Sequence, residues 1–238
     1  MQQQSQLKGL RVAVTGGTSG LGLALVRQLS VEGARVAFLA RGAEAVERTA
    51  AETGAFGIVG DVGRKADIYP LALQITGQLG GLDVLVNNAS SLGPTPLMPL
   101  ADTDCEALEL ALAVNLLGPF RLTKALFGAL AASAREGRGA LVLNISSDAA
   151  VSAYPGWGAY GASKAALQHM TAIWAEEARA EGIAFLSLDP GDMDTPLHAA
   201  AVPEADPASL KRPEESAAEI VAQLRGVLTQ GVPAGAPA

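Results

Sequence analysis

The sequence predicts one α/β domain in which a parallel, doubly wound β-sheet is flanked by helices. Short apolar runs rich in β-forming residues alternate with helical segments along the chain, which is typical of parallel strands joined by helical crossovers. The run at 83–87 holds consecutive apolar residues, as expected for a strand covered on both faces. With 238 residues and no linker, repeat or break in composition, residues 1–238 are expected to form a single domain.

Each expected element follows from the apolar pattern and the turn residues around it. Strands are predicted at 10–14, 35–39, 56–59, 83–87, 140–145 and 183–188. Helices are predicted after the first strand, at 68–79, in a long region after Thr103, at 160–181 and at 213–228. Gly80 and Gly81 end the helix at 68–79, and Thr103 with Glu106 is expected to form a capping box.

The residues that follow the predicted strands are the first candidates for a binding site. Ligands of doubly wound sheets bind at the carboxyl ends of the strands, and the crossovers of such sheets are right-handed. Five candidates fall just after predicted strands, namely Gly16, Asp61, Asn88, Ser147 and Gly191. We therefore expect these residues to meet at one edge of the sheet.

A glycine-rich turn follows the first predicted strand, in the run TGGTSGLG. Gly16, Gly20 and Gly22 would let the backbone approach a pyrophosphate, and the helix that follows offers free N–H groups to it. The spacing is TGxxxGxG and differs from the GxGxxG dinucleotide fingerprint. Taken alone, the run is also compatible with an ordinary glycine turn before a helix.

The end of the second predicted strand bears on the choice of cofactor. An acidic residue there would hold the ribose 2′-hydroxyl of NAD, but the strand ends in Ala40 and Arg41. A guanidinium can grip a 2′-phosphate through charged hydrogen bonds, so Arg41 favours NADP. The alternative is a solvated surface arginine at a helix start, and Ser19 in the glycine loop adds no second basic group.

Tyr160 and Lys164, in the run YGASK, are the strongest sign of chemistry. Their spacing places both side chains on one face of a helix. An ammonium near a phenol favours the phenolate, so the pKa of Tyr160 is expected to fall from about 10 toward neutrality. Such a phenol suits proton transfer to or from an alcohol or ketone, and Ser147 can hold the substrate oxygen as charge develops.

These motifs, in this order, resemble the short-chain dehydrogenase/reductase family in its single-domain form, over roughly residues 8–229. The matching runs are TGGTSGLG, the pair Asp61-Val62, NNA at 87–89, Asn115 in AVNLLGPF, and Pro190-Gly191 with Thr195. The resemblance implies a Rossmann-type fold, an oxidoreductase that uses NADP(H), and a catalytic set of Ser147, Tyr160, Lys164 and Asn115. It further implies that the cofactor is bound by Gly16, Thr18, Ser19, Gly20, Leu21, Gly22, Arg41, Asp61, Val62, Asn88, Ala89, Tyr160, Lys164, Pro190, Gly191 and Thr195.

The roles of these residues follow from the same resemblance. Tyr160 would exchange a proton with the substrate oxygen, Ser147 would orient that oxygen, and Lys164 would hold the nicotinamide ribose. Asn115 would support a water chain that reprotonates the site through Lys164. Read from the residues alone, Asn115 could equally be a buried and satisfied amide, and Ser146 or Ser147 a simple strand-end cap.

The chain departs from the family pattern at two places. Ser90 stands where a glycine usually closes NNAG, and a small effect is expected there. The end of the chain, LTQGVPAGAPA, has little strand character, so the family's seventh strand is expected to be missing or shortened. Residues 1–7 and 231–238 are expected to be flexible.

Composition limits the partners. The net charge of −7 disfavours nucleic acid or an anionic membrane. No apolar run approaches the ~20 residues of a membrane span, and the polar start does not resemble a signal peptide. Cys105 is the sole cysteine and His169 and His198 the sole histidines, so we expect no disulfide, no metal site and a cytoplasmic location. Cys105 could be a reactive thiol or a structural residue.

Sequence motifs identify the residues that would contact the substrate or a second subunit less specifically than the catalytic residues. The loops at 90–98 and 192–207 are expected to form the substrate walls and a mobile lid, with Tyr154, Trp157, Met193 and Leu197 as wall candidates and His198 as a contact. The alternative for each is loop packing. Alanine-rich helices around 111–132 and 165–175 could pack on the sheet or form the contact of a homodimer or homotetramer.

Three classes of function remain open from the sequence. The leading hypothesis is an NADP-dependent enzyme that interconverts a small-molecule carbonyl and an alcohol. The second is a nucleotide-binding sensor or scaffold, since binding and catalytic proteins share this fold. The third is a lyase or isomerase that uses the same site without net consumption of NADP(H).

Overall fold

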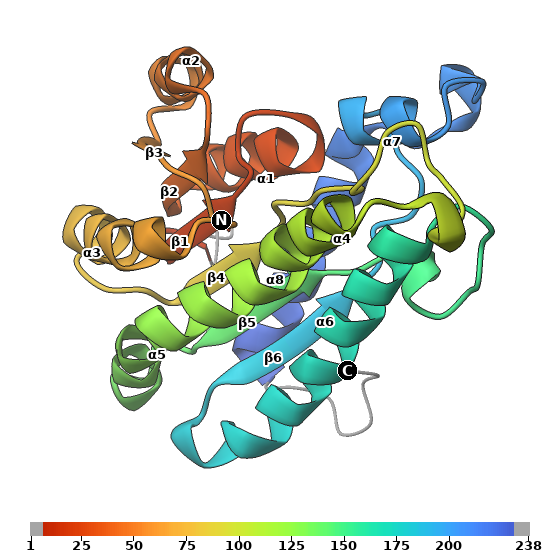
Figure 1. Ribbon diagram of the computed structural model, residues 1–238. Helices are drawn as coiled ribbons and strands as arrows, with labels where there is room; N and C mark the ends of the chain where they lie inside the picture. Colours follow the sequence, from red (N-terminus) through yellow and green to blue (C-terminus); the bar gives the residue numbers. More distant parts are fainter. Residues whose placement is uncertain (1–6, 231–238) are drawn as a thin grey trace.

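Six parallel strands form the sheet, in the order β3-β2-β1-β4-β5-β6 (Figure 1). The computed structural model describes residues 7–230. The strands are β1 (Arg11–Thr15), β2 (Arg35–Ala40), β3 (Phe56–Val59), β4 (Val84–Asn87), β5 (Leu141–Ile145) and β6 (Ala184–Leu188). The order reverses beside β1, which pairs with both β2 and β4, and doubly wound sheets bind ligands at such a reversal. The predicted Rossmann-type fold and all six predicted strands are confirmed.

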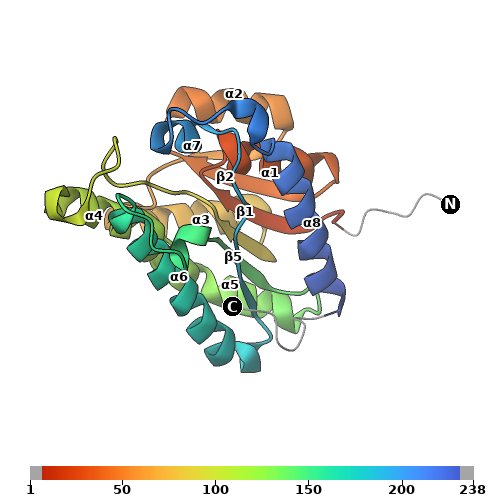
Figure 2. The same ribbon diagram turned by 90° about the vertical axis from the view of Figure 1, so that its right-hand side faces the viewer.

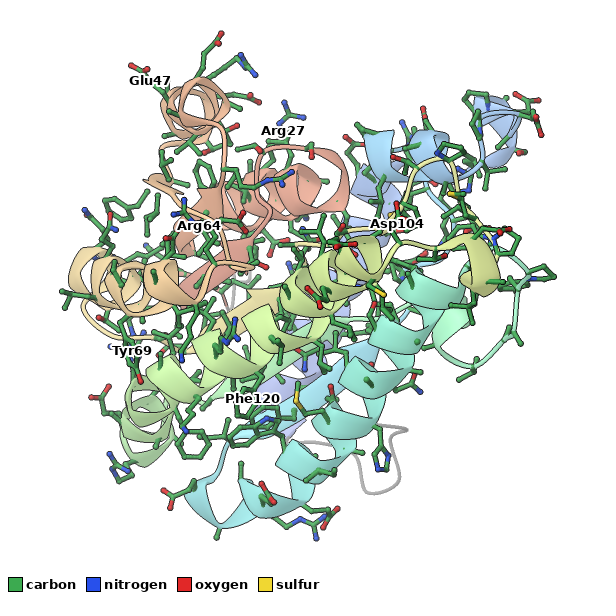
Figure 3. All side chains as sticks on the ribbon, viewed as in Figure 1. Arg27, Glu47, Arg64, Tyr69, Asp104 and Phe120 are labelled. Atoms are coloured by element: carbon green, nitrogen blue, oxygen red, sulfur yellow. The ribbon has the colours of Figure 1, made fainter. Side chains whose placement is uncertain are left out.

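Helices cover both faces of the sheet (Figure 2). They are α1 (Gly20–Val31), α2 (Ala43–Thr53), α3 (Ile68–Leu79), α4 (Cys105–Leu112), α5 (Gly118–Arg135), α6 (Gly158–Glu177), α7 (Pro196–Ala201) and α8 (Pro213–Gln230). Helices α1 and α8 pack on one face, while α3 and α5 pack on the other. Side chains such as Glu47 on α2 and Tyr69 on α3 point outward (Figure 3).

Successive side chains along each strand point to opposite faces of the sheet, so the strands contribute to two hydrophobic cores. Val12 and Val14 of β1 face the core under α1 and α8, whereas Ala13 between them faces the core under α3 and α5. Both sides of β4 are fully buried in the same way, which explains the continuous apolar run that marked this strand. The buried sheet fixes the register of the strands and therefore the positions of the loops at their ends.

The start of the long helical region differs from the expectation. Helix α4 begins at Cys105 with Asp104 as its N-cap, and Asp104 makes no side-chain cap hydrogen bond. Thr103 Oγ1 instead donates to the carbonyl oxygen of Pro99, because a short 3₁₀ turn at Leu100–Asp102 brings that carbonyl within 3.0 Å. The predicted capping box of Thr103 and Glu106 is therefore wrong.

A π-helical turn at Ala113–Leu117 separates α4 from α5. This turn, which the sequence pattern did not predict, places Asn115 at its centre. The continuous stretch Cys105–Arg135 is the one helical segment among residues 7–230 that is long and apolar enough to span a membrane by length and composition. Its buried side chains Leu122, Leu126 and Leu130 pack in the core on the sheet, so this packing accounts for its apolar character.

The two ends of the chain were expected to be flexible. Leu7, the one residue of these two segments that the structure describes, is 1% exposed and packs in the core beside α1 and α8. The rest of both segments, 1–6 and 231–238, lies outside the described residues. Within residues 7–230 no strand follows β6, since α8 occupies the chain from Pro213 to Gln230.

Candidate active site

A cleft of about 760 Å³ opens at the carboxyl ends of the strands. Of the catalytic and cofactor-binding residues predicted from the sequence, all of which lie within 7–230, only Asn115 does not line this cleft. The cleft is lined by Gly16, Thr18, Ser19, Gly20, Leu21, Gly22, Arg41, Asp61, Val62, Asn88, Ala89, Ser147, Tyr160, Lys164, Pro190, Gly191 and Thr195. The register of the sheet thus brings together residues that are far apart in the sequence.

The glycine loop after β1 forms a tight cradle at one end of the cleft. Gly16 has φ +71°, and a Cβ at Gly22 would lie 2.1 Å from the Gly16 carbonyl oxygen, so neither position tolerates an ordinary side chain. Ser19 caps α1 without a side-chain hydrogen bond, which leaves the N–H groups of the first turn for a ligand. This geometry fits the pyrophosphate of a dinucleotide.

The loop after β4 is tied to the end of β1. The backbone N–H groups of Asn88 and Ala89 both donate to Thr15 Oγ1 at 2.9 Å, and the Asn88 amide donates to the Thr15 carbonyl at 2.8 Å. These bonds explain why NNA and the glycine loop share one wall of the cleft.

The ends of β2 and β3 shape the far end of the same cleft. Arg41 is exposed there and, within residues 7–230, has no ion-pair partner, so its guanidinium is available to a ligand. Asp61 Oδ1 accepts a hydrogen bond from the Gly63 N–H at 2.8 Å, which holds the turn after β3. The side chain of Asp61 therefore shapes the turn as well as lining the cleft.

Tyr160 and Lys164 lie one turn apart on α6 and are both buried, at 7% and 2% exposed. The Lys164 Nζ donates to the carbonyl oxygen of Ile145 at 2.8 Å and lies 5.6 Å from the centre of the Tyr160 ring. Burial lowers the pKa of Lys164 from 10.5 to about 8, partly offset by the charge of Asp189. The lysine is thus held by the end of β5 rather than by the phenol hydroxyl.

The expected fall in the pKa of Tyr160 is wrong for the protein alone. Burial of the phenol raises its pKa, and the neighbouring Ser147 and Ser90 side chains, which lower it, offset only part of that rise. The carboxylates of Asp189 and Asp148 raise the pKa further. The ammonium of Lys164 lies 5.6 Å from the centre of the ring and does not outweigh these effects on the pKa of Tyr160.

Ser147 lies directly after β5 and is held by its neighbours. Its Oγ accepts from the Ala149 N–H at 3.2 Å and donates to Asp148 Oδ1 at 3.0 Å. The other oxygen of Asp148 accepts from the Tyr154 hydroxyl at 2.7 Å. Asp148, which the sequence analysis did not single out, therefore competes with a substrate for the Ser147 proton; its position directly after Ser147 is the only signal for it.

Asn115 is fully buried behind the cleft, at 0% exposed. Its amide nitrogen donates to the Ser91 carbonyl at 2.7 Å and to Ser163 Oγ at 2.8 Å, and its Oδ1 accepts from the Ser91 N–H at 2.8 Å. Asn115 thus joins the loop after β4 to α6 at the level of Tyr160. This arrangement matches the reading of Asn115 as a buried and satisfied amide.

Ser90 is the site residue whose importance the sequence analysis underestimated. It lines the cleft together with Tyr160, its side chain lowers the pKa of that phenol, and its Oγ donates to Asn115 Oδ1 at 3.2 Å. The departure from NNAG was visible in the sequence, but its contacts depend on the fold.

The predicted substrate walls are largely at the cleft. Trp157, Met193, Leu197 and His198 line it, whereas Tyr154 lines an adjoining hollow of about 290 Å³. The Trp157 ring meets the rings of Tyr154 and Tyr160 edge-on. The remaining histidine, His169, is exposed on α6 and does not line the cleft.

The segment after β6 closes the other side. Ser216 on α8 donates from Oγ to the Pro190 carbonyl at 2.9 Å, and Thr195 Oγ1 accepts from the His198 N–H at 3.2 Å to cap α7.

Among residues 7–230, no three His, Cys, Asp or Glu side chains are grouped to hold a metal ion.

Comparison with known proteins agrees with this geometry. The sequence model of a family described as short chain dehydrogenase matches residues 11–206. The 2-(R)-hydroxypropyl-CoM dehydrogenase of Xanthobacter autotrophicus is 34% identical over 194 residues, which cover 79% of this chain and 76% of that enzyme. The chain belongs to the short-chain dehydrogenase/reductase family, and it is an enzyme of this family of oxidoreductases.

Solved structures show the same likeness. A short-chain dehydrogenase from Shigella flexneri, complexed with NADP, has a TM-score of 0.81 and 27% identity over 90% of each chain. The 3-ketoacyl-(acyl-carrier-protein) reductase of Brucella melitensis, complexed with NADH, has a TM-score of 0.83 and 26% identity over 92% of this chain and 91% of that one.

Proposed function

We propose that this protein transfers a hydride between NADP(H) and a small-molecule carbonyl or secondary alcohol, with Tyr160 as the general acid and base. The observation that carries the proposal is the convergence of Ser147, Tyr160 and Lys164 on the cleft that also holds the glycine cradle. Dehydrogenase and reductase relatives, some solved with NADP and one with NADH, support the same chemistry.

In the reduction direction the substrate carbonyl lies between Ser147 and Tyr160. When bound in this cleft, the nicotinamide would supply the hydride for the carbonyl carbon, and the electron pair of the C=O π bond would move to the oxygen. Ser147 turns from Asp148 to donate a hydrogen bond to that oxygen, and Tyr160 gives it a proton. Lys164, cationic below about pH 8, favours the phenolate that remains.

The test is a panel of aldehydes and ketones, including hydrophobic ones, incubated with NADPH. We expect loss of NADPH absorbance in step with formation of the alcohol. Conversion of a substrate without net use of NADPH would identify a lyase or isomerase instead. Cofactor binding without turnover across the panel would favour a sensor or scaffold.

Cofactor preference is proposed to rest on Arg41. Loss of charge-assisted hydrogen bonds to the 2′-phosphate should weaken NADPH binding by about ten- to a hundredfold in Arg41→Ala, with NADH binding unchanged. Thermal-shift titrations with both nucleotides measure this, because ligands that bind the native state raise its stability. Arg48→Ala, an exposed arginine of α2 outside the cleft, is the control. An equal loss of affinity for NADPH and NADH in Arg41→Ala would show that Arg41 does not bind the 2′-phosphate.

We further propose a cytoplasmic homo-oligomer built on α4, the π-helical turn and α6. Leu110, Leu117 and Ile173 on these elements are exposed apolar side chains, at 49%, 37% and 46%. Large exposed apolar groups on adjacent helices suit a contact with a second copy.

A further inference from the structure

Ser90 lies beside Tyr160 in the cleft and beside the buried amide side chain of Asn115. Its side chain lowers the pKa of the Tyr160 phenol, while its Oγ donates to Asn115 Oδ1 at 3.2 Å on the inner side. A hydroxyl has one proton and two lone pairs, so it can donate to only one of these partners at a time.

The inner partner is fixed and does not depend on Ser90. Asn115 is held by both backbone groups of Ser91 and by Ser163 Oγ. When the Ser90 proton turns away, Asn115 Oδ1 keeps the hydrogen bond from the Ser91 N–H at 2.8 Å. Turning the Ser90 hydroxyl therefore leaves no buried acceptor unsatisfied, which would otherwise carry a large cost.

We propose that Ser90 is a second hydroxyl donor to the Tyr160 phenolate beside Ser147, and that it turns from Asn115 to Tyr160 as the phenol loses its proton. This inference rests on the proposed function. While Tyr160 is a phenol, Ser90 donates to Asn115 and its oxygen accepts from the phenol. After Tyr160 gives its proton to the substrate oxygen, the Ser90 O–H points to the phenolate. The O–H bond of Ser90 stays intact, so Tyr160 alone transfers a proton.

The charges around Tyr160 make such a donor valuable. Lys164 faces the phenol ring from α6, Asp148 approaches from the end of β5, and Asp189 from the end of β6. The loop at 87–93 and the π-helical turn carry no charged residue. Burial and the two carboxylates oppose the phenolate, while the hydroxyls of Ser147 and Ser90 favour it.

The direct test reads the protonation of Tyr160 without a substrate. The chain has three tyrosines, so Tyr69→Phe and Tyr154→Phe together leave Tyr160 as the sole tyrosine. Fluorotyrosine incorporated into this background reports the titration of Tyr160 by fluorine NMR. Ser90→Ala, Ser90→Thr and Ser91→Ala are compared in it, the last because the Ser91 hydroxyl bonds the Gly93 N–H.

We expect Ser90→Ala to raise the titration midpoint of Tyr160 by about one pH unit, since one hydrogen bond to the charged form is lost. Ser90→Thr keeps the hydroxyl and should titrate like the parent, as should Ser91→Ala. An unchanged midpoint in Ser90→Ala, or a Thr variant that titrates like the Ala variant, would overturn the proposal. With an active alcohol substrate, the pH profile of kcat/KM should move by the same amount in Ser90→Ala. The NMR result stands whether or not the carbonyl panel yields a substrate, so the two proposals can fail separately.

Discussion

Tyr160→Phe is expected to lower turnover by about 10²- to 10⁴-fold, the usual contribution of a positioned general acid or base. The phenyl ring fills the same buried space beside Trp157 and keeps the edge-on contact, so the fold and the cleft should persist. Only the proton donor is removed. The measurement is kcat with NADPH and a carbonyl that the wild-type enzyme reduces.

Two controls separate chemistry from binding and folding. The melting temperature of the Tyr160→Phe variant should stay near that of the wild type, and its stabilisation by NADPH should remain. Trp157→Phe, a change in the wall beside Tyr160, should mainly alter the KM for the substrate. Full turnover in Tyr160→Phe would refute the proposed mechanism while leaving the family membership intact.

The pH dependence of this reaction follows from the environment of the phenol. Because burial raises the pKa of Tyr160, the residue is protonated across the neutral range in the protein alone and is ready to act as an acid. Alcohol oxidation needs the phenolate, so the rate of oxidation should rise with pH. The ammonium of Lys164 and the hydroxyls of Ser147 and Ser90 are the groups that make this base accessible.

The sequence predicted the elements that depend on simple periodic patterns. The six strands were evident from short runs rich in apolar and β-forming residues, and the parallel sheet then required Gly16, Asn88 and Ser147 to meet at the carboxyl ends of the strands. Motif spacing was sufficient for Tyr160 and Lys164, since residues four apart share a helix face. These inferences use only local periodicity and the geometry of the sheet.

Properties set by tertiary surroundings were not predicted. The pKa of Tyr160 moves opposite to the expectation because solvation is lost when the whole cleft is assembled. Thr103 bonds to Pro99 because of a 3₁₀ turn that has no sequence period. Asn115 and Ser90 meet across a π-helical turn, and neither residue indicates the other in the sequence.

The largest effect on stability is expected at Asp83, which lies at the amino ends of the strands, opposite the cleft. This carboxylate precedes β4, and its side chain is 0% exposed. It accepts hydrogen bonds from Arg11 Nη2 at 2.6 Å, Arg138 Nη2 at 3.0 Å and Ser133 Oγ at 2.6 Å. Burial opposes the charge, but these partners outweigh it and lower the pKa of Asp83 from 3.8 to about 2.

Asp83→Asn should lower the free energy of unfolding by about 3 kcal/mol, because it leaves Arg11 and Arg138 without their carboxylate. For a domain of this size that corresponds to a fall in melting temperature of about 6–12 °C. Glu52→Gln is the control, since Glu52 makes an ion pair of similar geometry with Arg27 at the surface, where the effect should be much smaller. The cleft lies at the other ends of the strands, so cofactor binding should be retained.

The stability of the Asp83→Asn variant should depend less on acid pH than that of the wild type. A carboxylate whose pKa is depressed in the folded state stabilises fully above its unfolded pKa and loses that contribution as the pH falls through the folded pKa. For Asp83 this loss runs from about pH 4 to about pH 2 and amounts to about 2 kcal/mol. The stability difference between wild type and Asp83→Asn, followed by denaturant unfolding, should therefore be constant at neutral pH and shrink below about pH 4. A difference that is independent of pH would mean that Asp83 contributes by its shape and hydrogen bonds, and that its charge adds nothing.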